Sequence, residues 1–216
     1  MLTGSFAPCL PLGPIIKIKL QGKYQGYNTD DLIIYVKQTD TGKEAKLIGQ
    51  IKHSVKITNN KEFNKVIQAA WDDFNNIDVF SEGTDIIALI CGPLSATDTD
   101  DVRRLLRQAE DAEDESDFSQ RVSLGKFTSD QQRKKIEIFK ASLKSANKNI
   151  ELNNEQLWRF LKRFRLLIYD LDIKGVTLSL LHSLLGQYSQ TNANAFWTQL
   201  NSRQKRRKTA KNPKWQ

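Results

Sequence analysis

The chain contains few cysteines and histidines and has no long apolar run. Its 216 residues include two cysteines, Cys9 and Cys91, and two histidines. Two distant cysteines without metal-ligand spacing argue against a structural zinc site and indicate a reducing compartment. The apolar run at residues 86–91 is far shorter than the roughly 20 residues that cross a bilayer. We therefore expect a cytoplasmic protein that makes no membrane contact.

The N-terminal segment also lacks the features of a signal peptide. Residues 1–14 carry no positive charge and are interrupted by prolines at positions 8, 11 and 14. A signal peptide would begin with positive charge and continue as an apolar stretch. With 39% hydrophobic and 27% charged residues, the composition is that of an ordinary globular domain large enough to bury a core.

Positive charge is concentrated at the C-terminal end. The net charge is +8, and residues 203–216 hold seven basic residues and no acidic one, so the remaining chain carries only +1. This segment is either a solvated tail or linker, or a contact to a phosphate backbone. In the second case, the basic residues expected to bind nucleic acid are Arg203, Lys205, Arg206, Arg207 and Lys208. A basic stripe at Arg159, Lys162 and Arg163 has the same two interpretations, and a solvated helix face is the commoner one.

The order of the predicted elements indicates an α/β fold. Alternating or continuous apolar residues predict strands at 15–21, 31–37, 46–55, 84–91 and 164–172. Helical spacing predicts helices at 61–76, 130–146, 154–162, 176–188 and 193–204, which makes the chain mainly helical from about residue 97. A strand, helix, strand order requires a crossover connection, so we expect a central mixed sheet flanked by helices. We expect one domain over residues 1–200, with a hairpin at 31–54 and a basic tail or linker at 201–216.

The hairpin is expected to bring three polar residues together. With a two-residue turn at Thr41-Gly42, Asp31 lies directly opposite Lys52. Residues two apart on a strand point to the same side, so Gln50 and Lys52 project together from an otherwise apolar strand. Asp31 then shares their face of the sheet. A register shift of one residue would separate the three side chains.

These residue types suit metal-assisted hydrolysis of a phosphodiester bond. Mg²⁺ prefers oxygen ligands, and Asp31, the Gln50 amide and the Ile51 main-chain carbonyl would supply them. The metal would polarise the phosphate and activate a bound water. Lys52 would orient or deprotonate that water and stabilise negative charge in the transition state. An Asp opposite a Lys is also an ordinary cross-strand ion pair, worth under about 1 kcal/mol when exposed, and spacing alone leaves both interpretations open.

Several segments resemble one known group of nucleases. GYNTDDLIIYV at 26–36, GQIKHS at 49–54 and KEFNKVIQAAWDDF at 61–74 resemble the double-stranded-DNA nuclease domains of bacterial anti-phage effectors. These are the CD-NTase-associated endonucleases and the N-terminal nucleases of antiviral STAND NTPases, in the Mrr-like QxK branch of the PD-(D/E)xK superfamily. The similarity continues through FLKRFRLLIYDLD, LSLLHSLL and FWTQL and thus covers most of the chain.

The resemblance implies a restriction-endonuclease-like fold and roles for individual residues. Asp31 matches the metal-binding Asp, Gln50 matches the position of Glu or Asp in other members, and Lys52 matches the catalytic Lys. Asp30 is adjacent to Asp31 but points to the opposite face of the strand, so it is the second candidate for the site. His53 follows the Lys on the opposite face of the strand, where we expect it to pack. The implied activity is Mg²⁺-dependent endonucleolytic cleavage of double-stranded DNA in anti-phage defence.

The N-terminal segment departs from the family pattern. Family members place a helix with a metal-binding Glu before the first strand, whereas MLTGSFAPCLPLGP precedes the strand at residue 15 here. We therefore expect either an active nuclease or, as the alternative, an N-terminally truncated, non-catalytic DNA-binding or assembly module. The resemblance also implies an NTPase or sensor domain outside this chain as a partner, and it is compatible with a homo-oligomer.

Overall fold

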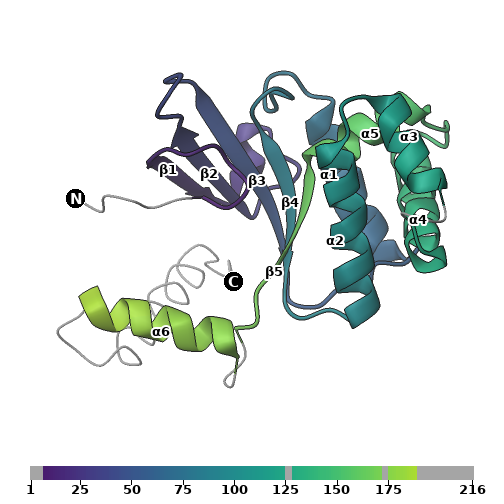
Figure 1. The fold of residues 1–216 in the computed structure, drawn as a ribbon. Coiled ribbons are helices and arrows are strands. Elements are labelled where there is room, and N and C mark those ends of the chain that lie inside the picture. Colours follow the sequence, from purple (N-terminus) through teal and green to yellow (C-terminus); the bar gives the residue numbers. More distant parts are fainter. Residues whose placement is uncertain (1–6, 125–127, 172–174, 189–216) are drawn as a thin grey trace, which may run out of the picture. The chain divides into compact units, whose positions relative to one another are not determined.

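The structure is a computed structural model that describes residues 7–124, 128–171 and 175–188 (Figure 1). The chain divides into two compact units, residues 1–168 and 169–216, and each is described by itself. The first unit contains a five-stranded sheet with strand order β1-β2-β3-β4-β5. The strands are β1 (Ile15–Leu20), β2 (Leu32–Lys37), β3 (Glu44–Lys52), β4 (Ile86–Cys91) and β5 (Phe164–Ile168).

The sheet is mixed, as the sequence predicts. The β1–β2 and β2–β3 pairs are antiparallel, whereas the β3–β4 and β4–β5 pairs are parallel. The helices are α1 (Lys61–Phe74), α2 (Ala96–Asp111), α3 (Glu115–Ser123), α4 (Asp130–Ala146) and α5 (Asn154–Arg163), with a short 3₁₀ turn η1 at Gly22–Gln25. Figure 1 shows α1 to α5 on one side of the sheet. The prediction of an α/β fold with a mainly helical second half is confirmed.

Side chains at the helix starts explain where these helices begin. The Asn60 side chain accepts hydrogen bonds from the backbone amides of Glu62 and Phe63 at the start of α1, both at 2.9 Å. Ser129 and Asn153 each form a reciprocal capping box with a Gln three residues later, at the starts of α4 and α5. These caps satisfy amides that have no partner inside the helix.

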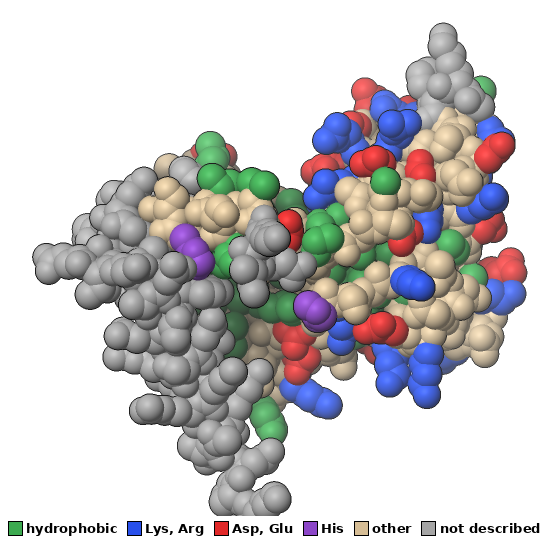
Figure 2. All heavy atoms as spheres, turned by 90° about the horizontal axis from the view of Figure 1, so that it is seen from below, with side chains coloured by type: hydrophobic (Ala, Val, Ile, Leu, Met, Phe, Trp, Pro, Cys, Tyr) green, Lys and Arg blue, Asp and Glu red, His purple; other side chains and the backbone are tan. Residues whose placement is uncertain are grey.

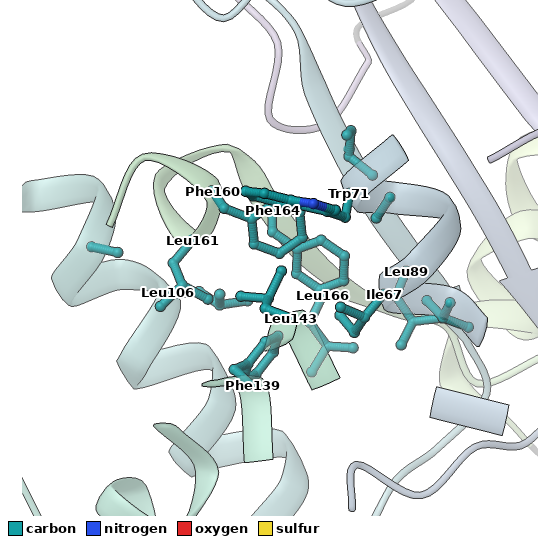
Figure 3. Close-up of a cluster of buried hydrophobic side chains, with 14 of the residues drawn as sticks. Ile67, Trp71, Leu89, Leu106, Phe139, Leu143, Phe160, Leu161, Phe164 and Leu166 are labelled. Atoms are coloured by element: carbon teal, nitrogen blue, oxygen red, sulfur yellow. The ribbon is translucent and has the colours of Figure 1, made fainter. Parts of the chain in front are cut away.

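The helix-covered face of the sheet holds the main core. Alternate residues of the inner strands, such as Ile48, Ile87 and Leu89, point into it. Figure 3 shows the aromatic part of this core, where Trp71 from α1 and Phe160 from α5 lie beside Phe164 of β5. The Phe160 and Phe164 rings stack with their centroids 5.6 Å apart. This packing fixes α1 against the sheet, which matters for the site described below.

The opposite face of the sheet is apolar but less covered. A small buried cluster of Leu47, Ile86 and Ala88 lies there, with Leu10 from the segment before β1 packed against it. Ile18 and Leu20 of β1 lie on the same side and are exposed. In the first unit, therefore, burial is concentrated on one face of the sheet.

The hairpin differs from its prediction at the turn. Gln38 pairs with Lys43, with its amide 2.8 Å from the Lys43 carbonyl, and four residues form the loop between them. Gly42, with φ at 67°, takes the left-handed conformation that this longer loop requires. The two-residue turn at Thr41-Gly42 was therefore a wrong prediction. The register moves by two residues, so Leu32 pairs with Gly49 and Asp31 is next to Gln50 rather than opposite Lys52.

The second unit is described through one helix, α6 (Val176–Tyr188), at the predicted residues. The helix predicted at 193–204 and the basic residues of the tail lie outside the described residues. No helix in the described ranges is long and apolar enough to cross a membrane.

Candidate active site

Asp31, Gln50 and Lys52 lie on one face at the same end of the β2–β3 hairpin. The actual register differs from the predicted one by an even number of residues, so the parity of every side chain is kept. Gln50 and Lys52 share the parity of Ile48, which points into the main core. All three polar side chains are half-buried at the margin of that face. The structure thus brings together the three residues that the sequence proposes as catalytic.

The carboxylate of Asp31 is fixed by two donors from β3. Its Oδ2 accepts a hydrogen bond from the Ile51 amide at 2.7 Å and another from the Gln50 side-chain amide. β2 begins at Leu32, one residue after Asp31. The Asp31 carboxylate therefore takes the place that a main-chain carbonyl of β2 would occupy if the strand began earlier. Within the described part of the chain, its other oxygen, Oδ1, accepts no hydrogen bond. One oxygen is therefore held in position, while no described residue donates a hydrogen bond to the other.

The Ile51 carbonyl projects toward the same side of β3. In an antiparallel pair, the N–H and C=O of one residue point to the same neighbouring strand. The Ile51 N–H points to Asp31, so its carbonyl also lies on that side. The Gln50 amide oxygen, the Ile51 carbonyl and Asp31 Oδ1 are the oxygen ligands that this end of the hairpin offers.

Lys52 makes no ion pair with Asp31. The register places Lys52 one step beyond Gln50 along the same face, and no ion pair between Lys52 and a carboxylate is found among the described residues. Its neighbour in β4 is the buried Cys91. The ordinary cross-strand ion pair that spacing alone left open is thus not formed.

His53 does not pack as expected. The sequence predicts that it packs on the face opposite Lys52, but the residue is exposed beyond the end of β3. Its carbonyl lies close to Gly92, where a Cβ would come within 2.7 Å of that oxygen. Gly92 thus permits the segments that follow β3 and β4 to approach each other closely. This contact restrains the chain directly after Lys52.

The loop before Asp31 is anchored by a buried carboxylate that the sequence analysis missed. Asp73 of α1 is 0% exposed and accepts hydrogen bonds from three N–H groups of the loop. These are the Asn28 amide at 2.8 Å, the Asn28 side chain at 3.0 Å and the Thr29 amide at 2.7 Å. Because α1 is fixed by the core, Asp73 positions the two residues that precede Asp30 and Asp31.

A second anchor of the same loop is a pair of tyrosines. The hydroxyl groups of Tyr27 and Tyr35 lie 3.0 Å apart in a buried hydrogen bond. Burial and this hydrogen bond raise the pKa of Tyr27 above its ordinary value, so the ring remains neutral. Lys17 and Lys19 of β1 lie over the Tyr35 ring, with their ammonium groups 5.3 and 5.1 Å from its centre. The loop is therefore held from both the helix side and the β1 side.

The connection after Lys52 is tied down by a buried ion pair. Lys135 of α4 contacts the carboxylate of Asp98 in α2 and donates a hydrogen bond to the Ile57 carbonyl at 2.9 Å. Both charged residues are buried. Segments on both sides of the candidate site thus depend on buried charged groups carried by the helices.

The donor set fits a weakly held Mg²⁺ better than a tightly held one. Among the described residues, no cluster of three His, Cys, Asp or Glu side chains is placed to hold a metal ion. Asp31 is joined only by neutral oxygens, and Gln50 at present directs its NH₂ group toward the carboxylate. Such a set leaves several positions of a hexacoordinate ion to water and to substrate oxygens, as Mg²⁺ usually does. Asp30 lies outside this set and lines a neighbouring hollow of about 290 Å³.

The basic stripe of α5 is engaged within the protein. The Arg159 guanidinium bonds Glu82, and Lys162 donates a hydrogen bond to the Ala112 carbonyl at 3.0 Å. Arg163 reaches the Gly83 carbonyl at 3.4 Å. On the face shown in Figure 2, acidic and basic side chains are interspersed over the described residues. The stripe is therefore a poor candidate for a continuous phosphate contact.

No known protein family, curated protein or solved structure matches this chain.

Proposed function

We propose that this chain is a Mg²⁺-dependent endonuclease that hydrolyses phosphodiester bonds of double-stranded DNA. The observation that carries the proposal is the site at the end of the β2–β3 hairpin. There, Asp31 is fixed with one oxygen available, Gln50 and the Ile51 carbonyl lie beside it, and Lys52 projects from the same face without an ion-pair partner among the described residues. The resemblance to the Mrr-like QxK branch of the PD-(D/E)xK nucleases supports the proposal. The order of elements, in which the β2–β3 hairpin is followed by α1 and then by β4 parallel to β3, supports it as well. On that resemblance, we place the activity in cytoplasmic anti-phage defence.

Each residue has a distinct part in the proposed reaction. Asp31, the Gln50 amide oxygen and the Ile51 carbonyl would hold Mg²⁺, and the Gln50 amide would have to rotate so that its oxygen, rather than its NH₂ group, faces the ion. When bound, the ion supplies polarisation of the scissile phosphate and a lower pKa of a coordinated water. Lys52 orients the attacking water and stabilises the additional negative charge that develops on the phosphate. Asp73 and Lys135 hold the segments before Asp31 and after Lys52, and so keep these groups in position.

The alternative is a DNA-binding or assembly module without catalysis. The specific observation that favours it is the single carboxylate of the donor set: the described residues offer Asp31 together with neutral oxygens only. One charge gives weak affinity for a divalent ion. The two functions differ in whether Lys52 changes the covalent state of DNA or only its binding.

The decisive experiment is plasmid cleavage by the whole chain with Mg²⁺. We expect wild type to nick or linearise supercoiled DNA and Lys52→Ala to be slower by about 100-fold or more. Lys56→Ala is the matched control, because Lys56 is exposed just beyond β3 and should leave the rate unchanged. If wild type cuts no faster than Lys52→Ala, the enzymatic function is refuted. DNA binding without cleavage would then favour the alternative.

Metal binding is tested separately through thermal stability. Gln50→Glu places a second carboxylate beside Asp31, so the variant should be less stable than wild type without metal and be stabilised more strongly by Mg²⁺. Asp31→Asn should abolish the Mg²⁺-dependent rise in Tm. An equal rise in wild type, Gln50→Glu and Asp31→Asn would show that the ion binds elsewhere.

A further inference from the structure

The 3₁₀ turn η1 presents one aromatic side chain to solvent beside the candidate site. Tyr24 is 99% exposed, whereas the neighbouring Tyr27 and Tyr35 are buried and paired. Single exposed apolar side chains are common on protein surfaces and need no function. Ile77, at 92% exposure, is such a residue on another loop. Tyr24 differs from Ile77 in how firmly its loop is attached to the site.

The turn is bonded directly to the main chain of Asp30 and of the proposed metal ligand Asp31. The Gly22 amide donates a hydrogen bond to the Asp30 carbonyl at 2.6 Å, and the Gln21 amide donates one to the Asp31 carbonyl at 3.3 Å. Gly26 closes the turn with φ at 89° and bonds the Lys23 carbonyl at 3.2 Å. The base of Tyr24 is therefore held at a fixed place relative to Asp31.

Two lysines line the hollow beside the turn. Lys23 precedes Tyr24, and Lys65 of α1 lines the same hollow, together with Asp30. The hollow itself is balanced in charge, because Asp30 and Asp72 line it together with the two lysines. A phosphate would therefore bind at the exposed lysines rather than inside the hollow.

We propose that this turn is a DNA-contacting element, in which Tyr24 packs against a base of the duplex and Lys23 binds an adjacent phosphate. The inference rests on the proposed function and names the part of the substrate that lies next to the cleaved bond. A tyrosine ring offers an aromatic face to any base, and side chains placed against a base step partially unstack it. A rigid turn holds the ring in place before binding, so little ordering is required when DNA arrives. The element would fix which base step is presented to Asp31 and Lys52.

Equilibrium binding of a fluorescent duplex to the whole chain, without divalent metal, tests the proposal. We expect Tyr24→Ala to weaken binding about 5- to 100-fold, as removal of a stacking aromatic does. Tyr24→Phe keeps the ring and should bind like wild type. Lys23→Ala should reduce the slope of log affinity against log salt by about one. Ile77→Ala is the matched control and should leave affinity unchanged.

The outcomes separate this inference from the proposed function. If wild type binds and cuts DNA but Tyr24→Ala binds equally well, the inference is overturned while the nuclease function stands. A wild type that neither binds nor cuts would overturn both. Tyr24 is exposed, so its replacement should not alter the Tm. A loss of affinity shared by Ile77→Ala would reflect a general change in the protein and would also refute a specific role of the turn.

Discussion

Replacement of Asp73 tests whether the loop before the candidate site depends on the buried carboxylate. One of its oxygens accepts both hydrogen bonds from Asn28, and the other accepts the bond from the Thr29 amide. Hydrogen bonds to charged groups contribute about 1.5–3 kcal/mol each. In the Asp73→Ala variant, the loop can open toward water, and hydrogen bonds to water recover part of this energy. We therefore expect Asp73→Ala to lower the free energy of unfolding by about 3 kcal/mol, close to the loss of one full bond and parts of two others.

Asp73→Asn distinguishes hydrogen bonding from volume. An asparagine keeps the shape but has one acceptor oxygen, so its NH₂ group must face either the Thr29 amide or the Asn28 donors. Two donors that face each other cannot bond, and we expect a loss of about 2 kcal/mol. Urea unfolding followed by tryptophan fluorescence measures both variants. Asp72→Asn is the matched control, because Asp72 is exposed and accepts one hydrogen bond from the Gln68 side chain.

The same variants test the link between the loop and the site. At a temperature where Asp73→Asn is fully folded, DNA cleavage should still be reduced at least tenfold, because Asp30 and Asp31 lose the support of the preceding residues. A stability of Asp73→Asn within about 0.5 kcal/mol of wild type would refute the proposed anchoring.

The remaining predictions concern buried groups outside the hairpin. Burial raises the pKa of the Cys91 thiol from its ordinary value near 9 to about 11. The neutral thiol therefore contributes fully to the free energy of unfolding below pH 9, and this contribution is lost as the pH rises toward 11. Cys91→Ala should make the free energy of unfolding less dependent on pH in this range. In native protein a thiol reagent should label Cys9 quickly and Cys91 only after unfolding, and rapid labelling of both would contradict the burial. Lys135→Met should cost about 3 kcal/mol by leaving Asp98 buried without its cation, while the double variant Asp98→Asn/Lys135→Met should recover much of that loss. Equal unfolding free energies of the single and double variants would refute this coupling.

The sequence places Asp31, Gln50 and Lys52 correctly on one face of the hairpin although it misplaces the turn. The face on which Asp31, Gln50 and Lys52 lie depends only on strand parity, which an error of two residues leaves unchanged. The identity of opposing residues depends on the loop length, and here Gln38 and Lys43 close a four-residue loop. Strand alternation is thus robust to an error that alters every cross-strand pair.

The supporting residues could not be assigned in the same way. Asp73 lies seven positions after Val66 on the buried side of α1, so a charged residue at a core position is visible in the sequence. Its partners, however, are two main-chain amides and the Asn28 side chain, in a loop 44–45 residues away, and no spacing pattern identifies them. Lys135 likewise occupies a buried position of α4, and its partners Asp98 and the Ile57 carbonyl follow from helix packing rather than from spacing.

The segment from Asn28 to Asp73 has a consequence for the order of folding. It contains the hairpin, Lys52, nearly all of α1 and the carboxylate that holds the loop. The contacts that hold this loop and Asp31 therefore join residues no more than 45 apart. The last strand pair joins Ile87 to Phe164 and must enclose four helices. Short loops close at lower entropic cost, which favours early formation of local pairs. During synthesis, the geometry around Asp31 would therefore begin to form before β5 leaves the ribosome.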